Sequence, residues 1–584
     1  MKELRSLVPY FKRYQALLWI GCFCIAFQNV MGLYVPVIVR KSVDAIQQAV
    51  HNSAQHLNAS GVLYWVAIII GLALLKGIGM YYMRQTIIVM SRKIEFDQRN
   101  DMFKRYQELD NNFYKTHATG DLMARINEDV SRVRMFTGPA ILYSINLFLL
   151  ILLVIGMMLY VNVELALLTL LPLPFLSYSV YYVNTIINKR SEAVQQQLSA
   201  LTTNSQEVYA GIRVIKSYVQ ENAIVNYFAK QADEYRDRSL KLAFVESVYF
   251  PLLAFLIGIS NIIIIYVCGH LIMKNLVTPG NMAEYFLYLN MLVWPVTSLG
   301  WVVSIIQRAA VSQRRINEFM QMPVADERNL NVAELNGSIE FDNVNLIYDN
   351  TGIQALKHVS FKIKAGEKVA IIGKTGSGKS SIAQLLMKVI PSNSGTIRIN
   401  NQEIDTLSAA SIRAQSAVVP QDLFLFSDTV ANNISLGLES TTEAELIAVA
   451  KLAQVHDEIM RLPNLYETEI GERGVTLSGG QKQRICIARA LIKQPRLIVL
   501  DDCLSAVDTT TEKAILTNLQ TVFEGRTVIN ITHRVMHLLH FDRILVLEEG
   551  KLIEQGAPQE LLAKNGYFAK IYREQQLQAV AEAV

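Results

Sequence analysis

The chain has 584 residues, of which 51% are hydrophobic and 18% are charged, and its formal net charge is +4. A chain of this length exceeds one ordinary domain, so two or three units are expected, and the small net charge gives no case for a nucleic-acid partner. The five cysteines show no metal-binding spacing, which favours buried, inert thiols over a disulfide framework. Most of the apolar excess precedes residue 310, and the remainder has the composition of a soluble α/β domain.

Six apolar stretches in the first half are each long enough to cross a bilayer, which takes about 20 helical residues. They are Ala16–Val39, Gly61–Tyr82, Gly138–Val161, Leu165–Val183, Ala243–Met273 and Ala283–Ile306. The preceding segment, Met1–Tyr14, is basic and has no small-residue cleavage site, so we expect an amphipathic elbow at the inner membrane surface and no removable signal peptide.

Basic residues in the loops predict the orientation of these spans. Ten Lys and Arg residues lie between spans two and three, from Arg84 to Arg134, and eight lie between spans four and five, from Lys189 to Lys241. Because positive loops stay on the cytoplasmic side, both termini and both long loops are predicted to be cytoplasmic. The short connection Asn162–Glu164 is then an external turn.

The two long loops, Met83–Phe136 and Asn184–Lys241, carry apolar residues at helical period among charges. We expect the spans to continue through them as helices and to reverse at short crosswise helices near Phe113–Leu122 and Gly211–Lys216.

Few polar residues interrupt the spans. Lys76 fits snorkelling, helix pairing or substrate contact about equally well. Gln28, Asn29, Asn146 and Asn261 could line a cavity or form interhelical hydrogen bonds. Three prolines, Pro172, Pro174 and Pro295, are expected to kink their helices.

After a polar linker, Asn317–Asn336, the strand-like Ser338–Phe341 opens the soluble half. The next buried strand, Val369–Ile372, runs into a G-x-x-x-x-G-K-S motif and then into a helix, which is the context of a P-loop. The motif and its flank comprise Gly373, Lys374, Thr375, Gly376, Ser377, Gly378, Lys379, Ser380 and Ser381. We expect backbone N–H groups and the helix N-terminus to cradle nucleotide phosphates, Lys379 to contact the β- and γ-phosphates, and Ser380 to hold Mg²⁺.

A second buried strand, Leu497–Leu500, ends in Asp501 and Asp502. A carboxylate at the end of such a strand can hold Mg²⁺ through its water shell, so Asp501 is predicted to be the acidic residue of the P-loop site.

The segment Leu477-Ser478-Gly479-Gly480-Gln481 resembles the signature motif of ABC ATPases, and its place between the P-loop and Asp501 separates the chain from kinases, GTPases and RecA-like motors. Other pieces resemble the same family. Tyr348 matches the aromatic residue that stacks on adenine. Gln421 matches the glutamine that contacts the metal and couples the γ-phosphate site to the membrane half. His533 matches the switch histidine that contacts the γ-phosphate. Ser505–Asp508, with Asp508, matches the dimer-interface loop, and Gly471–Gly474 matches the segment that touches the cytoplasmic loops in exporters.

This resemblance, to bacterial half-transporters of the multidrug and lipid exporter type, covers essentially the whole chain and implies the fold. It predicts a polytopic α-helical membrane domain of six transmembrane helices (residues 1–316), a linker (317–336), an α/β P-loop nucleotide-binding domain (337–576) and a C-terminal tail (577–584). It also implies ATP and Mg²⁺, a second half-transporter chain, membrane lipids and an amphipathic drug or lipid substrate, and an inner-membrane location with a cytoplasmic nucleotide-binding domain.

Asp502 departs from the family pattern, because family members that hydrolyse ATP well carry Glu there as the general base. Aspartate is one methylene shorter, which sets its carboxylate back by roughly 1.5 Å, so a hydrolytically weak site is expected. Similar chains resemble the degenerate-site member of heterodimeric exporters, which favours a heterodimer over a homodimer. A nucleotide-gated channel or regulator on the same scaffold is the alternative, although no ring of like charges marks a pore. An importer or a soluble ATPase is disfavoured by the fused spans.

Overall fold

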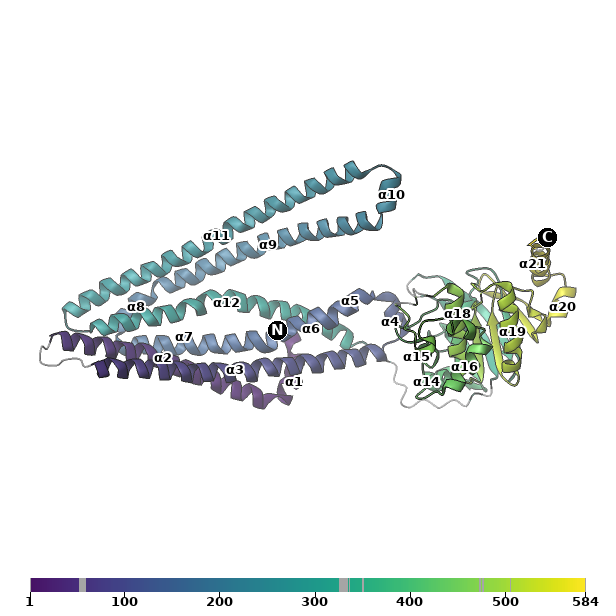
Figure 1. Cartoon of the computed structure of the whole chain (residues 1–584), viewed down its shortest axis with the longest axis horizontal. Helices are drawn as coiled ribbons and strands as arrows, with labels where there is room; N and C mark the ends of the chain where they lie inside the picture. Colours follow the sequence, from purple (N-terminus) through teal and green to yellow (C-terminus); the bar gives the residue numbers. More distant parts are fainter. Residues whose placement is uncertain are drawn as a thin grey trace. The chain divides into compact units, whose positions relative to one another are not determined.

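The structure, a computed structural model, describes residues 2–51, 59–324, 335, 337–348, 351–471, 474, 477–504 and 506–582. They divide into two compact units, one formed by Met1–Glu108 with Thr119–Met322 and the other by Leu109–Ala118 with Pro323–Val584. The predicted architecture, long apolar helices followed by an α/β domain, is confirmed (Figure 1). Most of the predicted linker, together with Glu472, Arg473 and Ser505, lies outside the described residues.

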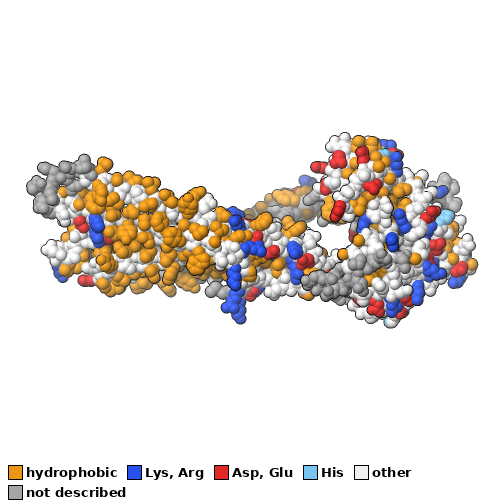
Figure 2. All heavy atoms as spheres, turned by 90° about the horizontal axis from the view of Figure 1, so that it is seen from below, with side chains coloured by type: hydrophobic (Ala, Val, Ile, Leu, Met, Phe, Trp, Pro, Cys, Tyr) orange, Lys and Arg blue, Asp and Glu red, His pale blue; other side chains and the backbone are white. Residues whose placement is uncertain are grey.

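The first unit is entirely helical in its described part. Its elements are η1 (Glu3–Leu7), α1 (Val8–Arg13), α2 (Gln15–His51), α3 (Ala59–Glu108), α5 (Thr119–Ala124), η2 (Arg125–Asp129), α6 (Val130–Met135), η3 (Phe136–Ala140), α7 (Ile141–Val161), α8 (Val163–Leu170), α9 (Pro172–Ala210), α10 (Ile212–Ser217), α11 (Glu221–Met273) and α12 (Pro279–Met320). Within the described ranges, six helical segments are long and apolar enough to cross a membrane, as the sequence predicts. On the face shown in Figure 2, hydrophobic side chains cover most of this helical surface along the spans.

The spans continue as helices beyond the apolar stretches, as expected. Helix α3 extends to Glu108, and α9 and α11 form a long hairpin with α10 at its tip (Figure 1). Helix α7 ends at Val161, where Asn162 caps α8 by accepting a hydrogen bond from the Leu165 amide at 2.9 Å, so the third and fourth spans are joined by a tight turn. Pro172 is the first residue of α9, and Pro295 lies inside α12.

Polar side chains form hydrogen bonds and an ion pair between the spans. Gln28 and Asn29 both donate to the Asn146 side-chain oxygen at 3.0 Å, so these amides join α2 to α7. Arg40 of α2 forms a 3.1 Å ion pair with the fully buried Glu284 of α12. Because a carboxylate in an apolar setting is costly unless paired, this contact ties the two helices together.

The second unit contains two sheets. The strands are β1 (Ile339–Ile347), β2 (Gln354–Ile363), β3 (Lys368–Ile372), β4 (Ser394–Ile399), β5 (Gln402–Glu403), β6 (Ser416–Val419), β7 (Leu497–Asp501), β8 (Thr527–Ile531), β9 (Arg543–Glu548) and β10 (Lys551–Gly556). An antiparallel sheet has the order β2-β1-β4-β5, and the larger sheet has the order β10-β9-β3-β8-β7-β6, in which every neighbouring pair except β10 and β9 is parallel.

The helices of this unit pack around the sheets. They are α4 (Asn111–Thr116), α13 (Lys379–Leu386), η4 (Ile404–Thr406), α14 (Ala409–Gln415), α15 (Val430–Ile434), α16 (Glu443–Leu452), α17 (His456–Ile459), η5 (Leu465–Glu467), α18 (Gly479–Ile492), α19 (Thr509–Phe523), η7 (Leu538–His540), α20 (Pro558–Ala563) and α21 (Tyr567–Glu582). Successive residues of β3 belong to separate cores, with Ala370 in one and Ile371 in the other, as expected for a strand buried on both faces.

Two boundaries differ from the predicted domains. Helix α21 continues past residue 576 to Glu582, where the sequence predicts a tail, because its apolar side chains anchor it on the α/β core and helix-forming residues follow. The segment Leu109–Ala118 groups with the α/β unit although its sequence neighbours are in the helical unit.

Candidate functional site

Four parallel strands place the predicted site residues along one edge of the larger sheet. The P-loop follows β3, Gln421 follows β6, Asp501 and Asp502 stand at the end of β7, and His533 follows β8. Since ligands of open α/β sheets bind outside the carboxyl ends of the strands, this edge is the expected place for a nucleotide.

A cleft of about 300 Å³ opens at this edge. It is lined by Tyr348, Ile353, Ala355, Thr375, Gly376, Gly378, Lys379, Ser380, Ser381, Gln421, Asp501, Asp502, Ile531, Thr532 and His533. Residues that are 185 positions apart in sequence, Tyr348 and His533, therefore share one cavity. The predicted signature residues, Leu477 to Gln481, and Asp508 do not line it.

Two P-loop glycines have positive φ angles, and at one of them a side chain would also clash. Gly378 has a φ of +95°, and a Cβ there would lie 2.3 Å from the Ala355 carbonyl oxygen, so both the conformation and the space exclude a side chain. Gly376 has a φ of +81° but faces open space, because no atom lies within 4 Å of its ideal Cβ. The loop thus forms a cradle that runs directly into the N-terminus of α13, where free N–H groups favour an anion.

Lys379 holds its ammonium group inside this cradle. Its Nζ donates to the carbonyl oxygens of Gly373 at 2.8 Å and Lys374 at 2.7 Å. Burial lowers the pKa of Lys379, whereas the charges of Asp501 and Asp502 act in the opposite direction. A phosphate group would supply the negative charge that stabilises this dehydrated cation.

Ser380 and Asp501 form a pair suited to Mg²⁺. The Ser380 hydroxyl donates to the Asp501 carboxylate at 3.0 Å, and burial raises the pKa of Asp501. A cation favours the ionised form of such a buried carboxylate, so the oxygen atoms of Ser380 and Asp501 fit a metal ion. Among the described residues, no group of three or more His, Cys, Asp or Glu side chains could hold a metal by itself. Mg²⁺ is usually held by one or two carboxylates together with substrate phosphates, and Asp501 could supply such a carboxylate.

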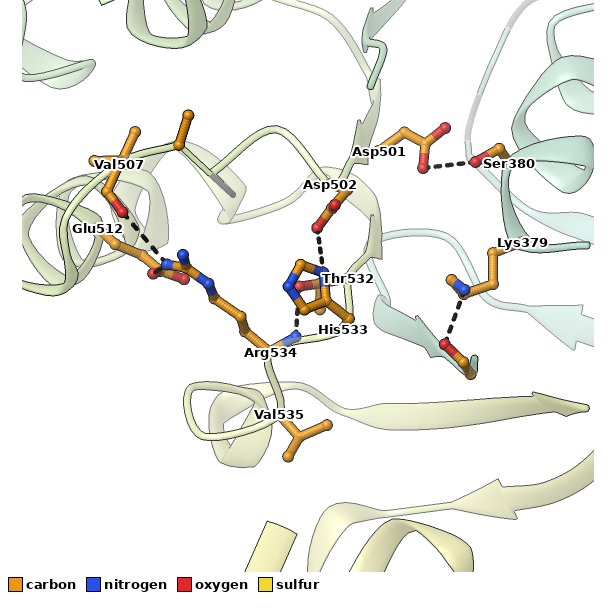
Figure 3. A network of polar contacts seen from close by, with 12 residues as sticks. Lys379, Ser380, Asp501, Asp502, Val507, Glu512, Thr532, His533, Arg534 and Val535 are labelled. Carbon is orange, nitrogen blue, oxygen red and sulfur yellow. Dashed lines mark hydrogen bonds and ion pairs between the residues drawn. The ribbon is translucent and has the colours of Figure 1, made fainter. Parts of the chain in front are cut away.

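Asp502 and His533 meet directly across the cleft (Figure 3). The distance from Asp502 Oδ1 to His533 Nδ1 is 2.9 Å, and 57% of the His533 side chain is exposed. Asp502 has a left-handed backbone with φ of +47°, and its amide donates to the Ile531 carbonyl oxygen at 2.8 Å. The sheet therefore fixes the backbone at Asp502, so that the length of the side chain decides how far its carboxylate reaches.

Arg534 connects this site to the neighbouring loop and helix. Its guanidinium forms an ion pair with the buried Glu512 of α19 and donates to the Val507 carbonyl oxygen at 3.4 Å (Figure 3). The turn that follows β8 is thereby tied to the loop that contains Asp508, which caps α19 by accepting a hydrogen bond from the Thr511 amide at 2.9 Å.

The predicted signature residues form the N-terminal cap of α18. The Ser478 hydroxyl accepts a hydrogen bond from the Gln481 amide at 3.2 Å, and the Gln481 side chain accepts one from the Ser478 amide at 2.8 Å. Such a capping box fixes the exposed start of a helix, where N–H groups point outward. The start of α18 is therefore a second surface of this unit that suits an anion.

The structure also reveals Lys115, which the sequence analysis did not select. Lys115 lies on α4 and places its ammonium group 5.3 Å from the centre of the Tyr348 ring, within the range of a cation–π contact. The Tyr348 hydroxyl lies 2.9 Å from the Ser381 hydroxyl oxygen. No local motif marks Lys115, because its contact joins segments more than 200 residues apart in the sequence.

Three of the five cysteines are buried, as expected, whereas Cys22 and Cys24 are half-buried. All five are free, and Cys268, Cys486 and Cys503 are buried. In the α/β unit, burial raises the pKa of the Cys486 and Cys503 thiols, which disfavours the reactive thiolate.

Comparisons with known proteins agree with this geometry. Residues 18–296 match the family model described as ABC transporter transmembrane region, and residues 356–505 match the one described as ABC transporter. The chain is 34% identical to the ABC transporter ATP-binding protein YknU of Bacillus subtilis, over 98% of this chain and 97% of that one. It is 34% identical to the multidrug resistance-like ATP-binding protein MdlA of Escherichia coli, over 94% and 93% of the two chains.

The chain is also similar to a lipid flippase and to a solved exporter structure. The ATP-dependent lipid A-core flippase of Syntrophus aciditrophicus is 30% identical over 88% of this chain and 86% of that one. The structure of a bacterial Atm1-family ABC exporter with ATP bound superposes with a TM-score of 0.78 at 26% identity, and the match covers 96% of this chain and 98% of that one.

Proposed function

The chain belongs to the ABC transporter family, with a transmembrane region and an ATPase domain in one polypeptide, and from this we propose that it is one half of a dimeric exporter. It couples ATP binding and hydrolysis to the outward movement of an amphipathic or hydrophobic compound, a drug or a lipid, across the inner membrane. The ATPase unit and both termini are cytoplasmic in this proposal, in line with the basic loops.

The observation that carries the proposal is the convergence of P-loop, acidic and switch residues on one cleft, in a chain whose described residues also form six apolar spans. The cradle fits phosphate groups, and the Ser380–Asp501 pair fits Mg²⁺. Relatives named as a multidrug resistance-like protein and as lipid A-core flippases support an exporter whose substrate is a drug or a lipid.

We assign the roles in the site as follows. Tyr348 stacks on the adenine, and the P-loop amides and Lys379 bind the β- and γ-phosphates. Ser380, Asp501 and Gln421 would hold Mg²⁺, which would neutralise phosphate charge. Asp502 accepts a proton from the attacking water and His533 contacts the γ-phosphate, both as parts of an electrostatic site preorganised by the strand ends.

We further propose that the site is completed by a second chain. Within the described residues, Ser478 at the start of α18 and Asp508 before α19 lie outside the cleft, although both start helices whose N–H groups suit an anion. In a dimer, these surfaces face the partner's nucleotide, and the partner's signature faces this chain's P-loop. The short carboxylate of Asp502 supports a heterodimer in which this chain's own site is slow.

The test is transport in inverted membrane vesicles that contain the chain and any co-purified partner. ATP-dependent accumulation of an amphipathic dye or a fluorescent lipid is expected, and it should be lost in the Lys379→Ala variant. Ion current in a planar bilayer without such accumulation would favour a nucleotide-gated channel. Identification of the co-purified chain separates a heterodimer from a homodimer.

A further inference from the structure

The C-terminal helix α21 is firmly anchored on the α/β unit. Phe568 and Ala569, in its first turn, are fully buried, and Phe568 belongs to one of the two cores. The Glu554 carboxylate of β10 accepts hydrogen bonds from the Tyr567 amide at 2.6 Å and from the Phe568 amide at 3.2 Å. A carboxylate at a helix N-terminus also complements the helix dipole, so the start of α21 has a fixed position.

Gln575 lies seven residues after Phe568, and therefore on the same face of the helix two turns later. Its Nε2 donates to the His533 carbonyl oxygen at 2.8 Å, and its Oε1 accepts from the Val535 amide at 2.9 Å. One side chain thus binds the carbonyl and the amide that flank Arg534 in the turn after β8. Both polar ends of the amide are used, so the contact specifies a single orientation of the turn.

His533 itself has little packing to hold it. Its side chain is 57% exposed, and its Nδ1 lies 2.9 Å from Asp502 Oδ1. The backbone must therefore fix the direction of the imidazole. On the strand side this is done by the Thr532 amide, which donates to the Ile371 carbonyl oxygen at 3.1 Å, and on the other side by Gln575.

We propose that Gln575 is a positioning residue for ATP hydrolysis, through which α21 holds His533 at the γ-phosphate. This inference rests on the proposed role of His533. Lys374 and Thr375 of the P-loop, His533 and Gln575 also line one hollow of about 740 Å³, so the helix and the phosphate loop border the same space. A shift of α21 would move the histidine without altering the P-loop amides or Lys379.

Three variants test the contact. Gln575→Ala removes both hydrogen bonds, whereas Gln575→Glu keeps an acceptor for Val535 and loses the donor to His533. Gln576→Ala is the matched control, because Gln576 is the same residue type on the next helix position and is exposed. All three are made in the full chain, purified together with any partner.

The first measurement is amide hydrogen exchange of the peptide that contains Val535, which needs no catalysis. In Gln575→Ala the Val535 amide should exchange about two- to tenfold faster, since one intramolecular hydrogen bond is lost. Gln575→Glu and Gln576→Ala should leave this exchange close to that of the unmodified chain. Unchanged exchange in Gln575→Ala would overturn the inference.

The second measurement is a double-mutant cycle with His533→Ala on ATP turnover at this chain's own site, made in the pair whose partner general base has been silenced. Gln575→Ala alone should lower kcat about tenfold with little change in nucleotide affinity, because misplacing a group that acts on the transition state need not alter ground-state binding. In the His533→Ala background, Gln575→Ala should cause no further loss.

The outcomes separate the inference from the proposed function. If His533→Ala lowers turnover and the loss in Gln575→Ala adds to it in full, Gln575 does not act through His533, and the inference alone is refuted. If His533→Ala leaves turnover unchanged, the proposed role of His533 fails and the inference fails with it. Equal loss in Gln576→Ala would attribute the effect to general damage to α21 and would also refute it.

Discussion

Lengthening the carboxylate at residue 502 by one methylene, in the variant Asp502→Glu, should raise ATP hydrolysis at this chain's own site. The backbone there is held by the hydrogen bond from the Asp502 amide to the Ile531 carbonyl oxygen at 2.8 Å. The added methylene therefore advances the carboxylate by about 1.5 Å instead of moving the chain. Proton abstraction needs a heavy-atom distance of about 2.6–3.2 Å, so a shift of this size decides whether the water is in reach.

The expected gain in hydrolysis rate is the benefit of a better-placed base less the cost of a disturbed contact with His533. A well-placed general base contributes roughly 10²–10⁴-fold, and recovery of even tenfold corresponds to about 1.4 kcal/mol of transition-state stabilisation. The longer side chain disturbs the 2.9 Å contact with His533, but the imidazole is 57% exposed. Such a solvent-screened contact is worth less than about 1 kcal/mol, so a net gain of about tenfold is expected.

The assay measures phosphate release from the purified pair in which the partner's general base has been silenced, so that one site is observed. Asp502→Asn is the control, because it keeps the shape of the side chain and removes the base. No gain in Asp502→Glu would refute the argument from side-chain length. High activity of the unmodified chain as a homodimer, abolished in Asp502→Asn, would make Asp502 a working base and refute the heterodimer proposal.

Three further predictions test the remaining assignments. Lys379→Ala should weaken nucleotide binding at this chain's P-loop by about tenfold to a hundredfold, since a charge-assisted contact to phosphate is lost; photolabelling by an ATP analogue measures it, and retained labelling contradicts the assignment. Ser478→Ala should lower turnover at the site whose P-loop is on the partner, whereas Ser478→Asn should retain the helix cap, worth about 1 kcal/mol; unchanged turnover in Ser478→Ala argues against a shared site. Gly378→Ala should unfold the ATPase unit at a lower temperature than Gly376→Ala, because both glycines have positive φ but only the Gly378 methyl would clash, 2.3 Å from the Ala355 carbonyl oxygen. Both replacements place an alanine in a left-handed backbone conformation, which costs about 1–2 kcal/mol. The difference between the two melting temperatures therefore measures the clash at Gly378, and equal melting temperatures would refute the clash.

The sequence predicts those parts of the molecule that depend on local pattern. The six spans follow from runs of apolar residues, and the P-loop follows from its glycine spacing between Ile372 and Lys379. The meeting of Gln421, Asp501 and His533 follows from parallel strands, whose carboxyl ends share an edge. Their roles in hydrolysis stay predictions.

Contacts between segments that are distant in the sequence are not marked by any local sequence pattern. Lys115 meets Tyr348 across more than 200 residues, and Gln575 reaches His533 from a helix that looks like an ordinary amphipathic end of the domain. Each contact depends on where two separately formed elements dock, and neither residue belongs to a motif. The end of α21 is hard to predict for a related reason, because the helix is stabilised by burial of Phe568 at its start and not by a motif in its last turns.

The membership of Leu109–Ala118 in the α/β unit has a consequence for synthesis and for dissection of the protein. This segment leaves the ribosome long before Pro323, so α4 has no surface to pack on until the strands of the α/β unit have been made. The α/β unit is therefore complete only when a segment made directly after the second apolar helix meets strands made some 200 residues later. A soluble fragment that starts at Pro323 would lack a piece of its own fold, including the Lys115 cation over Tyr348, and its nucleotide affinity would describe an incomplete domain.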